Sequence, residues 1–260
     1  PKTVTEDFER YDAWSTEFGD WTLTDGNKGY AGGFFDDLWY PNQFTQFAYI
    51  IFNPYVLGED VPRLNPWLLP FSGKQYAAVP YELDATGQAY VNSDNWIISP
   101  KLSGQAQTIS FYAHNMMVNN VAYIEDYDVL CSKTGNEIAD FTNVVLKNRQ
   151  AISGEWEKIT VSVPAGTTYF AIHQKTPQTG LMFGIDDVTF TKAMPVPTYY
   201  GIYRAGERID KVAATQFYYV DNNAGNNNRY AVTAIYADGT ESAPAEVSIP
   251  TGIDNVVMDG

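Results

Sequence analysis

LMFGIDDVTFTK, Leu181 to Lys192, is the stretch that decides the fold class, because apolar and polar residues alternate along it. A period of two residues is typical of a β-strand with one buried face. The same period recurs in QTISFYAH (107–114), AYIEDYDVLCSK (122–133), WEKITVSVP (156–164) and TYFAIHQK (168–175). Turn-forming clusters such as SKTGNE and PAGT separate these segments, and long helical periodicity is missing. The residues therefore predict an all-β fold built as an antiparallel sandwich.

Charge and cysteine content narrow the classes of partner. The formal net charge of the 260 residues is −15, and no Lys and Arg cluster could displace counterions from phosphates, which argues against nucleic acid and anionic membrane surfaces. No apolar run is long enough to insert into a membrane. The single cysteine, Cys131, excludes an intramolecular disulfide and a cysteine-based zinc site. In an extracytoplasmic protein, bound calcium could stabilise the fold in place of disulfide bonds.

The length of the chain predicts two domains. AMPVP (193–197) is a Pro-bearing joint, and a second all-β segment follows it. We expect a first domain over residues 1–194, a second over 195–250 and a C-terminal linker over 251–260. The segment from Asp25 to Phe71 is rich in Gly, Pro, Asn and aromatic residues, and we expect it to form long ordered loops across one face of the sandwich.

A series of short blocks resembles the cleaved-adhesin, or choice-of-anchor J, family over roughly residues 5–192. The most specific are DNWIISPKL (94–102) and the closing GIDDV (184–188), and the earlier blocks are DFE (7–9), WTLTDGN (21–27), AYIIFNP (48–54) and PFSGKQYAA (70–78). The resemblance implies a jelly-roll β-sandwich, similar in shape to carbohydrate-binding modules, with structural calcium. It also implies a secreted or cell-surface, outer membrane-associated location in a Gram-negative bacterium, as in the adhesin regions of gingipains.

The second segment resembles a fibronectin type III module. YGIYRAGERI (200–209) is similar to its strand C hairpin, and YAVTAIYADGTESAP (230–244) to its strand F to G hairpin, with Tyr230 as the corner tyrosine. There is no room for strands A and B, so we expect an incomplete sandwich of about five strands whose open face is covered by the first domain.

The two acids in GIDDV raise the question of metal binding. Neighbouring side chains of a strand face opposite sides, so Asp186 and Asp187 cannot form one acid–base pair. Ca²⁺ takes six to eight oxygen ligands, and the resemblance sets the opening strand beside the closing strand. The ligands expected for a structural Ca²⁺ are therefore Glu9, Asp25 and Asp187, with Asn27 beside them and Asp186 as the alternative to Asp187. The other interpretation is a solvent-facing acid that discourages strand aggregation.

Catalytic residues cannot be assembled from the sequence, so we expect no enzyme activity. His114 and His173 lie in expected strands without a linked Ser or Cys motif, and Cys131 shares a strand face with Tyr127 and Val129, as a small buried hydrophobe does. A glycosidase would need two carboxylates across a cleft. The loop acids that could serve are Asp36, Asp37, Glu59 and Asp60.

Aromatic residues of the long loops are the remaining binding candidates, chiefly Trp39 and Trp67, whose rings could stack on a sugar or anchor a protein. The alternative is that they close the sandwich as part of its core, as we expect for Trp21 and Trp96. Three functions stay open: a non-catalytic adhesin that binds a glycan or a host or extracellular protein, an accessory domain pair of a larger secreted peptidase or other hydrolase, and a hydrolase that uses loop carboxylates. The first is preferred, and no oligomeric state is predicted.

Overall fold

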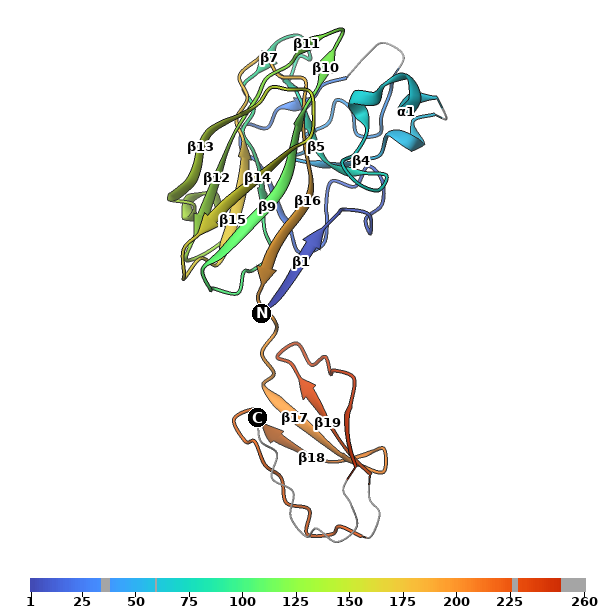
Figure 1. Cartoon of the computed structure of the whole chain (residues 1–260), viewed down its shortest axis with the longest axis vertical. Helices are drawn as coiled ribbons and strands as arrows, with labels where there is room; N and C mark the ends of the chain where they lie inside the picture. The colour runs from blue at the N-terminus through green and yellow to red at the C-terminus, as the bar shows by residue number, and fades with distance from the viewer. Residues whose placement is uncertain (34–37, 59, 226–228, 249–260) are drawn as a thin grey trace. The chain divides into compact units, whose positions relative to one another are not determined.

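The computed structural model describes residues 1–33, 38–58, 60–225 and 229–248 (Figure 1). The chain divides into two compact units, residues 1–193 and residues 194–260, and each is built from its own β-sheets. The division falls one residue from the end of the first domain expected from AMPVP.

Two large antiparallel sheets form the body of the first unit, and two smaller sheets of short strands accompany them within its described residues. The first sheet has the order β14-β9-β16-β5-β4, and β1 also pairs with β16. The second has the order β13-β12-β15-β8-β2. The strands of the first sheet are β1 (Lys2–Glu6), β4 (Ile50–Phe52), β5 (Tyr76–Pro80), β9 (Gln107–Asn115), β14 (Glu157–Val163) and β16 (Met182–Lys192). Those of the second are β2 (Thr22–Asp25), β8 (Asn95–Ile98), β12 (Glu125–Ser132), β13 (Asn143–Ala151) and β15 (Tyr169–Gln174).

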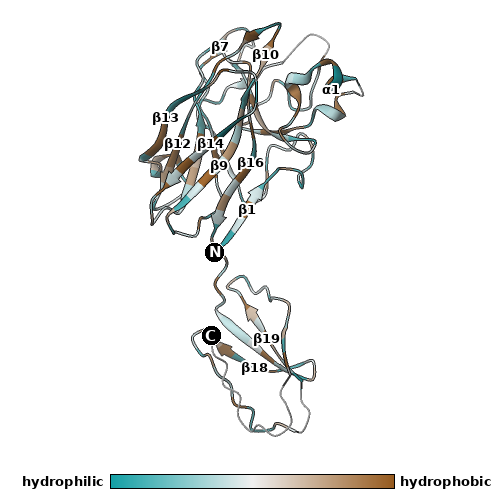
Figure 2. Cartoon of the chain, viewed as in Figure 1, coloured by the Kyte–Doolittle hydropathy of each residue, from teal (hydrophilic) through white to brown (hydrophobic). Residues whose placement is uncertain are grey.

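The main core lies between the two sheets because alternate residues of each strand point inward. Phe111 of β9 and Ile185 of β16 meet Val129 of β12 and Phe170 of β15 in one buried cluster. Figure 2 shows hydrophobic and hydrophilic residues following one another along these strands. The five segments read from the period of two are all strands, so the all-β, jelly-roll prediction is confirmed. Strand β13 was not predicted, because much of it is exposed.

Strand β16 contains a β-bulge at the two acids. Asp186 pairs with Tyr112 and Thr189 with Ser110, so Asp187 and Val188 together face a single residue, Phe111. Asp187 adopts a φ of 47°, in the left-handed region. The bulge shifts the inward phase from Phe183 and Ile185 to Val188 and Phe190, which the simple alternation did not anticipate.

Long connections cover the outer face of the first sheet over β4 and β5, as expected for the aromatic-rich segment. Tyr40, Phe52, Leu68 and Tyr76 form a second buried cluster there. Its short elements are β3 (Tyr30–Ala31), the 3₁₀ helices η1 (Pro54–Val56) and η2 (Pro66–Leu68), and α1 (Val61–Leu64). The remaining short elements of this unit are β6 (Glu82–Leu83), β7 (Tyr90–Val91), β10 (Met117–Val118), β11 (Val121–Ala122) and the 3₁₀ helix η3 (Ile138–Asp140).

In the second unit the described residues form one antiparallel sheet of order β18-β17-β19-β20, one strand fewer than expected. The strands are β17 (Tyr199–Arg204), β18 (Glu207–Ala213), β19 (Arg229–Ile235) and β20 (Ala245–Ser248). The Tyr230 hydroxyl donates to Asp221 Oδ2 at 2.7 Å and so ties the connection before β19 to the sheet. The expected linker, residues 251–260, lies outside the described residues. Within the described ranges, no helix has the length and apolar character needed to cross a membrane.

Candidate functional site

The expected calcium ligands lie in two separate groups. Glu9 and Asp187 meet at the loop from Ser72 to Gln75, beside the first sheet. Asp25 and Asn27 lie at the end of β2, in the second sheet. Sequence reasoning joined all four in one site because it assigned the opening and closing strands, and the loop after β2, to one edge.

In the first group, which also contains Asp186, the carboxylates accept hydrogen bonds from backbone amides and from one hydroxyl of the loop. Asp186 is fully buried, and its Oδ2 accepts from Ser72 N at 3.1 Å. Asp187 Oδ1 accepts from Ser72 Oγ at 2.9 Å, and Glu9 Oε1 accepts from the amides of Lys74 and Gln75 at 2.8 and 2.9 Å. Burial, reinforced by the neighbouring Asp187 charge, raises the pKa of Asp186 to about 7. The group acts as a clamp on the loop.

The second group is built by the pairing of β2 with β8, which sets Asp25 opposite Asn95. Glu82 joins it from β6, and its Oε2 accepts from Asn27 Nδ2 at 3.2 Å. Asp25 Oδ1 accepts from the Lys28 amide at 2.6 Å. Burial raises the pKa of Glu82 to about 7, and the Asp25 charge adds to the rise.

Three buried oxygens of this second group have no hydrogen-bond partner: Asp25 Oδ2, Glu82 Oε1 and Asn95 Oδ1. Each such oxygen is costly to leave unpaired, and carboxylate and amide oxygens are the donors that Ca²⁺ prefers. Gly29 leaves room beside them, since a Cβ there would lie 2.8 Å from Glu82 Oε1. The residues therefore fit a hard cation, although no cluster of three His, Cys, Asp or Glu side chains suited to a metal occurs among the described residues.

Sequence reasoning missed Glu82 and Asn95 as members of this group. Asn95 stands inside the most specific block, DNWIISPKL, and nothing in that block marks its side chain as a ligand. Only the register of β2 against β8, and of β3 against β6, brings these residues together.

Each histidine stacks on a tryptophan ring and contacts a backbone carbonyl or a carboxylate. His114 is buried, stacks on Trp156 and bonds the Gly154 carbonyl through Nε2 at 3.1 Å, and burial lowers its pKa to about 4. His173 stacks on Trp96 with ring centroids 3.9 Å apart and contacts Asp94 Oδ1 at 2.8 Å. Neither has a Ser or Cys nucleophile among the hydrogen bonds described. Cys131 lies in the main core, as expected.

The loop acids give no catalytic pair in the described part of the chain. Asp36, Asp37 and Glu59 lie outside the described residues. Asp60 is 70% exposed and forms an ion pair with Arg63 at 2.8 Å. Such exposed pairs contribute little to stability.

The loop aromatics divide into exposed and packed rings. Trp39 is 65% exposed and Phe44 is 49% exposed, and their ring centroids are 6.0 Å apart in an edge contact. Trp67 instead packs against the second buried cluster. Trp21 and Trp96 are buried in core clusters, as expected.

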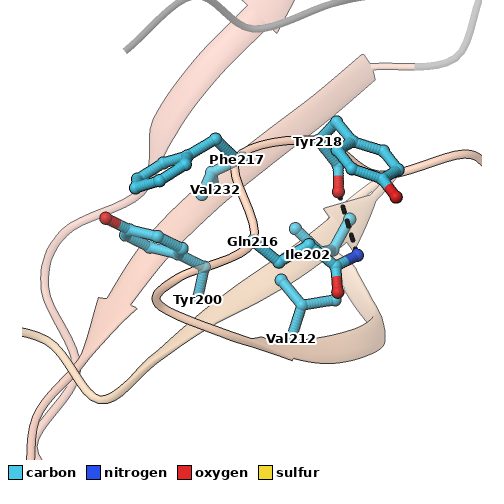
Figure 3. A pocket seen from close by; sticks show the side chains of 7 residues that line it. All are labelled: Tyr200, Ile202, Val212, Gln216, Phe217, Tyr218 and Val232. Atoms are coloured by element: carbon cyan, nitrogen blue, oxygen red, sulfur yellow. Dashed lines mark hydrogen bonds between the residues drawn. The ribbon is translucent and has the colours of Figure 1, made fainter.

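The second unit carries an apolar pocket of about 150 Å³ on one face of its sheet (Figure 3). Figure 3 shows Phe217 and Tyr218, from the connection after β18, standing over side chains of the sheet. Gln216 Nε2 donates to the Tyr218 carbonyl at 3.0 Å. The lining is Tyr200, Ile202, Val212, Gln216, Phe217, Tyr218 and Val232.

The first unit is thus a jelly-roll β-sandwich domain with long loops over one sheet. Residues 71–190 match the model of the Cleaved Adhesin Domain. This match confirms the resemblance seen in the sequence blocks.

The curated relatives are large proteins of Porphyromonas gingivalis. Gingipain R1 is 28% identical over 194 residues, which cover 66% of this chain and 11% of that protein. Hemagglutinin A of strain W83 is 26% identical over 203 residues, which cover 69% of this chain and 9% of that protein. The chain therefore spans about a tenth of the length of these relatives.

Among solved structures, the K1 cleaved adhesin domain of Lys-gingipain from P. gingivalis W83 aligns with a TM-score of 0.53 and 20% identity, over 75% of this chain and all of that domain. The K2 domain of Lys-gingipain aligns with a TM-score of 0.50 and 21% identity, over 73% of this chain and 99% of that domain. At these identities the likeness shows the fold alone.

Proposed function

We propose that this chain is a non-catalytic binding module of a secreted or surface-attached protein of a Gram-negative bacterium, and that it binds a glycan or a host or extracellular protein. The observation that carries the proposal is the exposed pair Trp39 and Phe44 in the long connections of the first unit. Large rings that stay in water are the usual anchors of a binding surface. The match to the Cleaved Adhesin Domain supports the proposal. The two histidines also support it, since their described hydrogen-bond partners are the Gly154 carbonyl and Asp94 and not a Ser or Cys nucleophile.

Binding to immobilised glycans and extracellular proteins tests the proposal. Replacing an exposed anchor ring removes about 2 kcal/mol, so Trp39→Ala should weaken binding roughly 30-fold and leave the melting temperature unchanged. Trp67→Ala is the matched control, because it removes a packed ring and should lower stability by about 3 kcal/mol while the folded fraction still binds. Unaltered binding by Trp39→Ala, or release of product over time, would contradict the proposal.

We further propose that a structural Ca²⁺ is held by Asp25, Glu82 and Asn95, with Asn27 beside them. The ion would supply the positive charge and the coordination that their unpaired buried oxygens lack. Glu9 and Asp187, which the sequence suggested as ligands, accept hydrogen bonds from the Ser72–Gln75 loop instead.

A second candidate function is an accessory domain pair of a larger secreted peptidase or other hydrolase. The aligned residues cover only about a tenth of the length of each relative, so the chain is similar to one part of a much larger protein, and this favours the accessory role. The full reading frame distinguishes the two, because an adjoining catalytic domain would assign the chain to the accessory role.

A further inference from the structure

Phe71 is an exposed aromatic ring held flat on the first sheet. Its ring stacks on Tyr112 of β9 with centroids 3.4 Å apart and an angle of 14° between the planes. Trp156 makes an edge contact with it at 6.4 Å. Phe71 nevertheless remains 40% exposed, so it offers ring surface to a ligand.

The loop that carries Phe71 is fixed on both sides of the ring. Before it, the Leu69 carbonyl accepts from Trp156 Nε1 at 2.9 Å. After it, Ser72 is bound by Asp186 and Asp187, and the next amides are bound by Glu9. Gly73, with a φ of 61°, is required there, since a Cβ would lie 2.4 Å from Glu9 Oε1. A ring fixed in this way loses little conformational entropy when a ligand stacks on it.

Hydroxyl groups cover the sheet face next to this ring. Alternate residues of β9 and β14 fill the core, so the intervening ones point outward. Thr160, Ser110, Thr189 and Thr5 follow one another across four paired strands, and Ser162 pairs with Thr108 in the next row. The Thr5 and Thr189 hydroxyls lie 2.8 Å apart. Paired strands are about 4.8 Å apart, so the row is a regular ladder of donors and acceptors.

The charges of this face favour an uncharged ligand. Lys158 Nζ lies 5.8 Å from the centre of the Tyr112 ring, and the Asp187 carboxylate accepts from the hydroxyl of Ser72, the residue after Phe71. The whole chain has a net charge of −15, which repels polyanions. An apolar protein surface would cover these outward-facing hydroxyls and leave them without water or partners. A neutral polyhydroxylated chain can satisfy the hydroxyls and stack on Phe71.

We propose that Phe71, Tyr112 and the hydroxyl row Thr160–Ser110–Thr189–Thr5 form a binding face for a neutral glycan chain. The inference rests on the proposed function in treating the chain as a binding module, and it adds a surface that uses neither Trp39 nor Phe44. The acid clamp of Glu9, Asp186 and Asp187 positions the loop that presents the ring.

Affinity electrophoresis of the full chain in gels containing soluble neutral β-glucans, galactans or xylans, with heparin and polygalacturonate for comparison, tests this proposal. The wild type should be retarded by at least one neutral polysaccharide and by neither polyanion. Phe71→Ala should lose at least tenfold in affinity, and Phe71→Tyr should keep most of it. Tyr90→Ala, which removes another exposed ring, is the matched control and should bind as the wild type does.

A Ser110→Ala, Thr160→Val double variant leaves the Phe71 loop intact and should weaken binding several-fold with an unchanged melting temperature. The proposal falls if no neutral polysaccharide retards the wild type, if polyanions are preferred, or if this double variant and Phe71→Ala both bind normally. Loss of binding in Trp39→Ala but in neither of these variants would leave the proposed function standing and overturn only the glycan face.

Discussion

In the first unit, burial raises the pKa of three carboxyl groups, those of Glu82, Glu125 and Asp186, to about 7. Their oxygens differ in their partners. Both oxygens of Glu125 accept hydrogen bonds, from Thr176, Gln174 and the Leu181 amide. Glu82 keeps an unpaired buried oxygen. The same residue type therefore serves as a structural acceptor in one place and as a candidate metal ligand in another.

Removal of calcium should destabilise the first unit at pH 8. If Ca²⁺ binds only the native state and its free concentration is a hundred times the Kd, the free energy of unfolding rises by about 2.7 kcal/mol. For a domain of this size the melting temperature then rises by roughly 5–10 °C. The gain should shrink at pH 5, because Glu82 has a pKa of about 7 and must lose its proton before it binds a cation. Scanning calorimetry with Ca²⁺ and with a chelator at both pH values measures this.

Glu82→Gln should abolish the calcium-dependent rise in melting temperature. Glu125→Gln is its control and should retain the rise, since the oxygens of Glu125 already have partners. A wild-type melting temperature that is the same in Ca²⁺ and in chelator would eliminate the site.

Glu125 should also make stability depend on pH. Its folded-state pKa of about 7 lies above the ordinary value of 4.5, so its contribution is fully present below about pH 4.5 and is lost as the pH rises through 7. The loss is on the order of 3 kcal/mol. Urea unfolding of Glu125→Gln should show a flatter dependence than the wild type between pH 4.5 and 7.5, and identical slopes would refute the assignment.

At the scale of the element, β16 shows how one bulge changes the meaning of a sequence pattern. In a regular strand, Asp186 and Asp187 would face opposite sides, one inward and one outward. The bulge inserts one residue, so that both acids reach Ser72. The alternation of inward-facing residues stops after Ile185 and resumes at Val188. In the sequence this interruption appears as two consecutive polar residues, Asp186 and Asp187.

The left-handed backbone at Asp187 should favour glycine over a β-branched residue. Asp187→Gly and Asp187→Val both lose the bond to the Ser72 hydroxyl, so their difference isolates the backbone. A left-handed non-glycine residue costs about 1–2 kcal/mol, and Asp187→Val should be less stable than Asp187→Gly by at least that amount. Denaturant titration of the pair measures it, and a valine variant as stable as the glycine variant would argue against the bulge.

At the scale of the whole molecule, the second unit has a single described sheet with an apolar face. Ile202 and Val232 lie on that face, and Phe217 and Tyr218 above it remain about 60% exposed. A complete fibronectin-like sandwich would cover such a face with a second sheet. Its cover by the first domain remains a prediction.

Residues 195–250 expressed alone should therefore be poorly folded or aggregate. Circular dichroism and thermal melting of this fragment, beside the full chain, decide the point. A soluble fragment with its own cooperative transition would show that the single sheet is sufficient.

The sequence by itself determined the sandwich, the joint between the units and the long strands other than β13, because period-two burial and turn residues act over neighbouring positions. Blocks such as DNWIISPKL also indicated the resemblance to the cleaved-adhesin family, whose model residues 71–190 match. Only the tertiary structure decided which acids meet. Strand register and one bulge separate Glu9 and Asp187 from Asp25. Strand register also brings Glu82 next to Asn95. The register and the bulge are set by contacts between residues far apart in the chain, and no local pattern encodes them.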